Sequence, residues 1–194
     1  MKTDRCKFKL SIKLFMAVFC AGELIGALSF NNEALRSTAE VFFRNRISHT
    51  FIETLLNSFS GAFLLVLACL LLGVSAAFMP LIPAVPFFHG LGVGVMLAGM
   101  NADYGIRGTL ISLIFVLPFA VLSAMVVIAA AKESFAMSGL CIRVMLGEDK
   151  SDIGTLKLYF TKFLALFALL AVLSLADSLV TYFFAGTWSA FMQK

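Results

Sequence analysis

A long uncharged stretch dominates the pattern of hydrophobic and polar positions along this chain. No formally charged side chain occurs between Glu53 and Asp103. A single membrane-spanning helix needs about 20 apolar residues, so this stretch is long enough for two. Its midpoint carries Pro80 and Pro83, and proline removes a backbone donor and disfavours helix in the residue before it. The pattern therefore predicts a transmembrane hairpin that turns at these prolines.

The same pattern along the rest of the chain predicts an all-α fold, an integral membrane helical bundle with about five transmembrane helices. Its 194 residues leave room for a single membrane domain. The predicted spans cover about 11–30, 59–79, 81–100, 108–131 and 159–184. We expect the fourth helix to run on into a cytoplasmic segment, 132–155, and to end at Gly147, because glycine favours the turn that ends a helix.

Composition and charge agree with a membrane location and set an orientation. Hydrophobic residues make up 61% of the chain and charged residues 13%, about half the charge of a soluble domain. With the N-terminus in the cytoplasm, ten lysines and arginines lie inside and five outside, which is the asymmetry that membrane proteins show. We therefore expect a multi-pass protein of the cell membrane with an external C-terminus. The lipid bilayer places the positive charge, so the net charge of +4 does not indicate a nucleic-acid partner.

The external segment 31–58 has a helical pattern of its own. Apolar residues recur there at helical spacing, and charged residues occupy much of the rest. This is typical of an amphipathic helix that lies on the outer leaflet or covers the end of the bundle. A surface that docks a partner protein is the alternative interpretation. The candidate partner-binding residues are Phe42, Phe43, Ile47 and Phe51.

Three ionisable residues fall inside predicted spans: Glu23, His89 and Asp177. A charged or titratable group in a membrane is a functional candidate by default, so a proton or ion relay is one interpretation. The alternative is that each group is satisfied by a neighbouring helix or by nearby water. The three are expected at depths that differ by roughly 10 Å or more, at about 1.5 Å of rise per residue. No cofactor, metal site or nucleophile–base pair is predicted, which favours a non-enzymatic protein.

Glycine carries the strongest packing signal in the predicted spans. The pairs Gly22 and Gly26, and Gly90 and Gly94, each show the small-xxx-small spacing, and Gly92 narrows the third span further. Small residues allow membrane helices to approach closely and gain dispersion contacts. We therefore predict tight helix contacts at these five glycines.

Five short motifs follow one another in a fixed order along the chain. They are Leu71-Leu72-Gly73-Val74-Ser75, Pro80-Leu81-Ile82-Pro83, Phe87-Phe88-His89-Gly90-Leu91-Gly92-Val93-Gly94, Tyr104-Gly105-Ile106-Arg107-Gly108 and Leu117-Pro118. In their order and spacing the chain resembles, over nearly its whole length, the stage II sporulation protein M family. That family has an opening helix, a hairpin around a proline-containing turn, a helix reading roughly aromatic-x-G-x-x-x-G, a short loop ending in glycine and a span with Leu-Pro. The opening span, with Phe15, Gly22 and Gly26, fits the first helix, whereas His89 departs from the family pattern.

This resemblance implies a scaffold function. The named member of the family is a polytopic membrane protein that is needed for engulfment of the forespore. It is thought to anchor or recruit two cell-wall hydrolases, stage II sporulation proteins D and P, at the septal membrane. The expectation is therefore a non-enzymatic membrane scaffold whose partners are peptidoglycan hydrolases or further copies of itself. The alternative is a small transporter or permease subunit that works with a separate ATPase.

Overall fold

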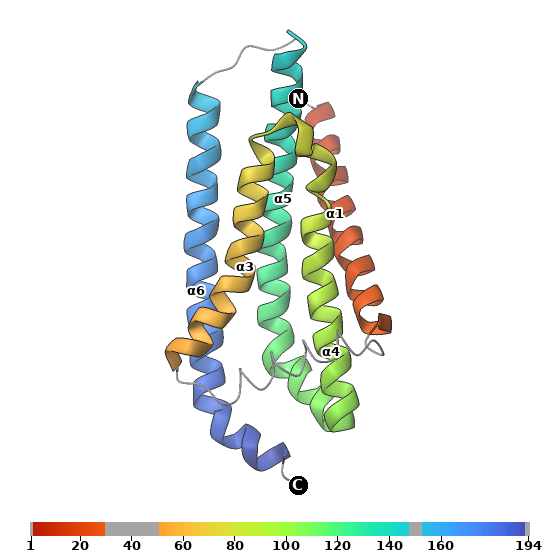
Figure 1. Cartoon of the computed structure of the whole chain (residues 1–194), viewed down its shortest axis with the longest axis vertical. Coiled ribbons are helices and arrows are strands. Elements are labelled where there is room, and N and C mark those ends of the chain that lie inside the picture. The colour runs from red at the N-terminus through yellow and green to blue at the C-terminus, as the bar shows by residue number, and fades with distance from the viewer. Residues whose placement is uncertain (1, 30–50, 148–152, 193–194) are drawn as a thin grey trace.

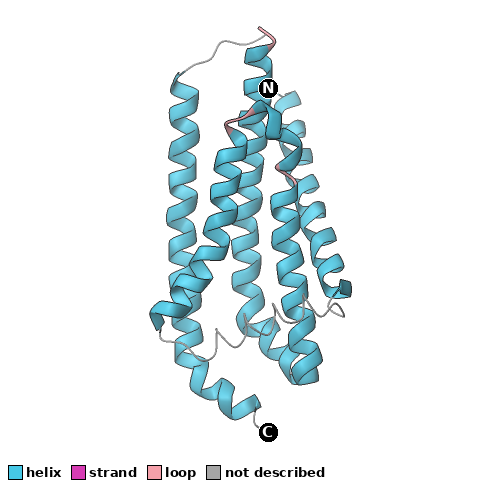
Figure 2. Cartoon of the chain, viewed as in Figure 1, coloured by secondary structure: helices cyan, strands magenta, loops and turns pink. Residues whose placement is uncertain are grey.

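The computed structural model describes residues 2–29, 51–147 and 153–192, and this part of the chain is helical, without a strand. Five long helices form the bundle: α1 (Lys2–Leu28), α3 (Phe51–Gly73), α4 (Ala84–Ile111), α5 (Leu117–Met145) and α6 (Ile153–Met192). Two short elements connect them, the 3-10 helix η2 (Ala76–Leu81) and the π-helical segment η3 (Ser112–Val116). The predicted all-α fold is confirmed for these residues (Figure 2).

The helices lie side by side along the long axis of the molecule (Figure 1). α1 packs on α4, α3 contacts both α5 and α6, and α5 also contacts α1 and α4. The N-terminus and the η2 turn lie at one end of the bundle, and the C-terminus lies at the other (Figure 1). The topology therefore places the predicted inner and outer ends of the helices at opposite ends of the molecule.

Four segments of the described chain are long and apolar enough to cross a membrane. They are Phe51–Gly73, Ala76–Ala102, Leu117–Met145 and Gly154–Phe183. The shortest, with 23 residues, is about 34 Å long at 1.5 Å per residue, enough for a hydrocarbon core of about 30 Å. The predicted span at 11–30 corresponds to α1, which is not among the four, so the number of five remains a prediction. Residues 31–50 of the predicted external segment, with Phe42, Phe43 and Ile47, lie outside the described residues.

The structure breaks the helix between the third and fourth predicted spans at Gly105, whose φ of 58° lies in the region that favours glycine. Helical structure then continues through Ile111 and η3. α5 begins at Leu117, later than the predicted span 108–131, so Pro118 lies in its first turn. Proline suits this position because the first backbone N–H groups of a helix have no intrahelical partner. The candidate span is therefore Leu117–Met145.

The turn of the predicted hairpin and the end of α5 each have a local explanation. The chain turns through η2, with Pro80 inside it and Pro83 immediately before α4, as the prolines predict. At the far end of α5, Gly147 has a φ of 77° and its N–H donates to the Val144 carbonyl at 3.1 Å. The predicted helix end at Gly147 is therefore confirmed.

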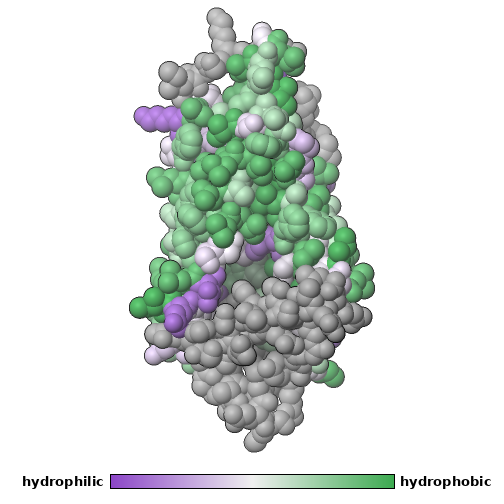
Figure 3. Space-filling view, in the orientation of Figure 1, coloured by the Kyte–Doolittle hydropathy of each residue, from purple (hydrophilic) through white to green (hydrophobic). Residues whose placement is uncertain are grey.

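The core lies where α1, α3, α5 and α6 meet. Its largest fully buried side chains include Phe15, Val66, Val127, Phe163 and Leu170. Large hydrophobic residues also cover much of the outer surface of the bundle (Figure 3). An apolar surface of this extent on a soluble monomer would be unusual, whereas lipid can cover it in a membrane.

Candidate functional site

α1 meets α4 through its two glycines. A Cβ atom on Gly22 would collide with the backbone carbonyl of Phe87, and one on Gly26 with the carbonyl of Leu91. A side chain at either position would therefore force the two helices apart. The opening helix lies with its backbone directly on the backbone of α4.

The same contact involves two glycines of α4. A Cβ atom on Gly90 would meet the Phe19 carbonyl, and one on Gly94 would meet the Glu23 carbonyl. The structure thus brings four of the five predicted glycines into one contact, with each pair against the partner helix's backbone. Gly92 does not take part, because a Cβ atom there would have no neighbour within 4 Å. A helix turns about 100° per residue, so a glycine two positions from Gly90 or Gly94 faces the other side of α4.

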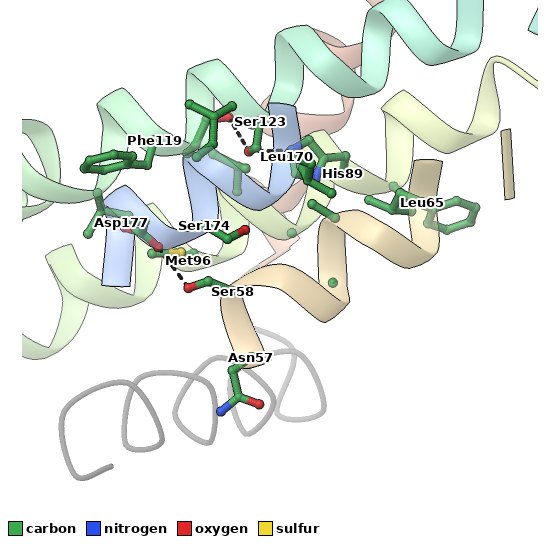
Figure 4. A pocket seen from close by; sticks show the side chains of 18 of the residues that line it. Asn57, Ser58, Leu65, His89, Met96, Phe119, Ser123, Leu170, Ser174 and Asp177 are labelled. Carbon is green, nitrogen blue, oxygen red and sulfur yellow. Dashed lines mark hydrogen bonds between the residues drawn. The ribbon is translucent and has the colours of Figure 1, made fainter. Parts of the chain in front are cut away.

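That other side of α4 borders a cavity of about 400 Å³ between four helices. α3, α4, α5 and α6 each contribute residues to its wall, as Figure 4 shows. Most of the wall is apolar, and the polar side chains gather in two groups. On α6 the cavity reaches from Leu170 to Asp177, a distance of about 10 Å at 1.5 Å per residue. The cavity is therefore long enough to separate the two polar groups.

Asp177 defines the first polar group. The hydroxyl of Ser58 donates to Asp177 Oδ2 at 2.9 Å, which joins α3 to α6. Asp177 is 7% exposed, and Asn57 and Ser174 line the wall beside it. A buried polar group is stable only when it is hydrogen-bonded, and Ser58 supplies one such bond. This end of the cavity therefore presents a carboxylate together with small polar side chains.

His89 and Ser123 form the second polar group, toward the other end of the cavity (Figure 4). Ser123 Oγ lies 3.3 Å from His89 Nε2, and the same hydroxyl donates to the Ala120 carbonyl at 2.9 Å. The His89 ring also lies 5.9 Å from the Phe19 ring, measured between centroids. A serine hydroxyl has one proton, and the shorter bond directs it to Ala120.

Two glycines form part of the wall between the polar groups. Gly61 of α3 and Gly92 of α4 both line the cavity, and neither would meet an atom within 4 Å if it carried a Cβ. Both residues are exposed, so larger side chains at these positions would narrow the cavity where they line it without displacing the backbone. The cavity therefore depends on the small size of these two residues.

The structure changes the picture of the three ionisable residues. His89 and Asp177, which were expected at different depths, line the same cavity. Glu23 does not line it, and its backbone lies in the contact with α4 instead. Ser58 was not predicted from the sequence, because its bond to Asp177 spans 119 residues. The sequence does signal the α6 side of the cavity, since the helical spacing of Leu170, Ser174 and Asp177 places all three on one face.

A further polar cluster, formed by Tyr159 and Ser134, contacts the end of α3. The hydroxyl of Tyr159 donates to the Leu70 carbonyl at 2.9 Å, and that of Ser134 donates to the Cys69 carbonyl at 2.6 Å. A carbonyl oxygen has two lone pairs and can accept more than one hydrogen bond, so side chains of α5 and α6 tie these helices to the last turns of α3. Gly73 leaves the space that this junction needs, since a Cβ atom there would meet Tyr159 and Ser134.

An ion pair joins α5 to α6 on the same half of the bundle. Lys162 Nζ lies 2.7 Å from Glu133 Oε2, and Lys132 Nζ lies 3.3 Å from Glu133 Oε1. Among the described residues, no group of three or more His, Cys, Asp or Glu side chains could hold a metal ion.

Comparison with known protein families, with curated proteins and with solved structures finds no match to this chain.

Proposed function

We propose that this chain is a non-enzymatic scaffold of the cell membrane, similar in role to stage II sporulation protein M. The observation that carries the proposal is the glycine contact between α1 and α4. It joins the two segments with the most distinctive motifs of the resemblance, the opening helix with Gly22 and Gly26 and the aromatic-x-G-x-x-x-G helix with Gly90 and Gly94. The motifs that define the resemblance thus also define the closest helix contact, which supports a shared architecture.

A rigid contact suits a protein that holds others in place. Helices that meet backbone to backbone have little freedom to slide, because the glycines leave no side chains to rearrange. A transporter that works by alternating access needs one group of helices to move against another. The α1–α4 pair therefore serves best as a fixed platform, with its N-terminus in the cytoplasm and the segment after α1 outside.

The proposed partners are peptidoglycan hydrolases, such as stage II sporulation proteins D and P, held at the outer face. The candidate surface is the segment 31–58, of which residues 51–58 are described and form the start of α3. Phe51 is half-buried, and its ring lies 6.0 Å from that of Tyr182 on α6, in an edge-to-face arrangement. The segment thus connects to the bundle at the C-terminal helix. Phe51 acts as an anchor there, which leaves Phe42, Phe43 and Ile47 for a partner.

Affinity capture from gently solubilised host membranes tests this proposal. The variant Phe43→Asp with Ile47→Asp replaces two apolar residues at helical spacing by charges, which a buried contact does not tolerate. We expect the captured wall hydrolases to fall about tenfold, as a loss of ~1.4 kcal/mol in binding gives. The control, Asn45→Asp with Ser48→Asp, adds the same charge to the same segment and should retain them. Equal capture by both variants at equal abundance, or capture of no wall hydrolase at all, would contradict the scaffold.

A second candidate function follows from the cavity. A permease subunit needs a polar site between its helices, and the structure places His89 and Asp177 around one cavity. The same capture experiment separates the two candidates. Recovery of an ATPase in place of wall hydrolases favours the permease.

A further inference from the structure

The cavity between α3, α4, α5 and α6 has the size, shape and chemistry of a ligand site. Its volume of about 400 Å³ falls within the range of roughly 300–1,000 Å³ that small-molecule sites occupy. We propose that it binds a single-chain amphiphile whose head donates hydrogen bonds to the Asp177–Ser58 end. The apolar chain would extend along the cavity toward His89. This inference goes beyond the scaffold function and does not depend on it.

The apolar part of the wall selects a hydrophobic body. Between its polar groups the cavity is bordered by Ala62, Val95, Phe119 and Leu173, in addition to the glycines. Burying an apolar chain there is favourable by about 25 cal/mol for each Å² removed from water. A fully polar solute, such as a sugar or an inorganic ion, would leave most of this wall without a partner. The wall therefore excludes polar solutes as good ligands.

The polar end selects the chemistry of the head. A carboxylate accepts hydrogen bonds at about four lone-pair positions, so Asp177 can accept from a ligand in addition to its partners in the fold, Ser58 among them. Ser174 lines the same end and can donate or accept. A plain hydrocarbon would leave this end facing an apolar surface, which is costly for polar groups. Hydroxyl or amide groups on the ligand avoid that cost.

The two cavity glycines indicate that the space is an integral part of the fold. Gly61 and Gly92 come from different helices, and both have open space where a side chain would project. Alanine would be the better helix former at each position by about 1 kcal/mol. The glycines therefore leave volume unfilled at some cost in helix stability, which is the arrangement expected if another molecule fills it.

Photolabelling tests the proposal with the full-length protein in phosphatidylglycerol vesicles. One probe is a monoacylglycerol with a diazirine in its acyl chain, carried in the vesicle. The other is a diazirine derivative of octylglycerol, added from water. We expect labelled peptides from α3 and α4 around Gly61 and Gly92. Unlabelled octylglycerol should compete, and methyl octanoate, which has a similar chain but no donor, should not.

Cavity-filling variants provide the decisive comparison. Gly92→Leu and, separately, Gly61→Leu should each lower labelling about tenfold, equivalent to ~1.4 kcal/mol. Gly139→Leu is the matched control, because a Cβ atom there meets only Met79 at an ordinary 3.8 Å, and labelling should not change. Thermal unfolding of each variant shows that it is folded, and either cavity glycine alone suffices for the test.

The remaining outcomes are equally informative. Labelling by the monoacylglycerol alone identifies bilayer lipid as the source of the ligand, and labelling by octylglycerol alone identifies a solute. Equal competition by methyl octanoate would overturn the proposal, since the head would then contribute nothing. Labelling spread over the outer surface, or unchanged in both cavity-filling variants, would overturn it as well.

Discussion

The two sides of α4 use the same residue for opposite purposes. On the side facing α1, Gly90 and Gly94 have the backbone of another helix where a side chain would be. On the other side, Gly92 has open space and borders a cavity. Spacing along one helix predicts which glycines share a face, but only the neighbouring helices decide whether that face is closed or open. A glycine in a membrane helix therefore indicates only that a side chain is absent. Whether another helix or open space lies beside it has to be found from the structure.

The largest effect should come from exchanging leucine for glycine on the two sides. Gly94→Leu must separate α1 from α4, because the side chain would overlap the Glu23 backbone. Overpacking of a core costs about 1–3 kcal/mol when side chains can adjust, and a backbone cannot adjust as easily. We expect the apparent free energy of unfolding to fall by ~3 kcal/mol or more.

Gly92→Leu is the matched control for this change. It should leave stability unchanged or raise it by about 1 kcal/mol, since leucine favours helix more than glycine does. Thermal unfolding in detergent micelles, followed by size-exclusion chromatography, measures both variants. Similar losses at the two positions would show that both sides of α4 are closed.

An intermediate effect is expected on the open side, where Ser58 bonds to Asp177. Ser58→Ala removes a donor from a carboxylate that is 7% exposed, which costs about 1–3 kcal/mol. Ser60→Ala, two residues further on, loses only an exposed bond to the Asn57 carbonyl at 3.3 Å, so its stability should change little. If Ser58→Ala loses less stability than Ser60→Ala in the same unfolding assay, the bond from Ser58 to Asp177 does not stabilise the fold.

The smallest effect is expected at the other polar group. Ser123→Ala loses a 3.3 Å contact with His89 and a bond to a carbonyl of its own helix. A net contribution of about 0.5 kcal/mol is typical of a weak hydrogen bond. Function in a complementation assay should persist at normal abundance. Complete loss of function with normal stability would instead assign chemistry to the Ser123–His89 pair.

Local chemistry made part of this fold predictable from sequence. Pro80 and Pro83 fix the hairpin turn, and Gly147 ends α5, because each acts through its own backbone restrictions. The spacing of Gly90 and Gly94 likewise gave a shared face without any knowledge of α1. The break before the fourth span depends on a positive φ at Gly105, which lies in the polar segment 101–107 between two predicted spans. The start of the next candidate span, Leu117 in place of 108, could not be predicted because residues 108–116 are as uncharged as the helix that follows.

The cavity could not be predicted in the same way. It requires His89 on α4 and Asp177 on α6 to line one cavity, although α5 lies between these two helices in the sequence. Their relative rotation is set by side-chain packing across the bundle, which no local pattern encodes. Sequence therefore identified two of the polar residues but neither their common site nor Ser58.

The hydroxyl of Tyr159 also bears on how the chain is made. It reaches the Leu70 carbonyl across 89 residues of sequence, and synthesis proceeds from the N-terminus. When α3 and α4 first enter the bilayer, this donor has not yet left the ribosome. Unpaired backbone carbonyls are costly in hydrocarbon, so this hydrogen bond adds to the protection of the end of α3 only once α6 has been made. The last helix therefore completes the polar contacts of the first hairpin, and we expect a chain halted before Tyr159 to leave the end of α3 more open to water.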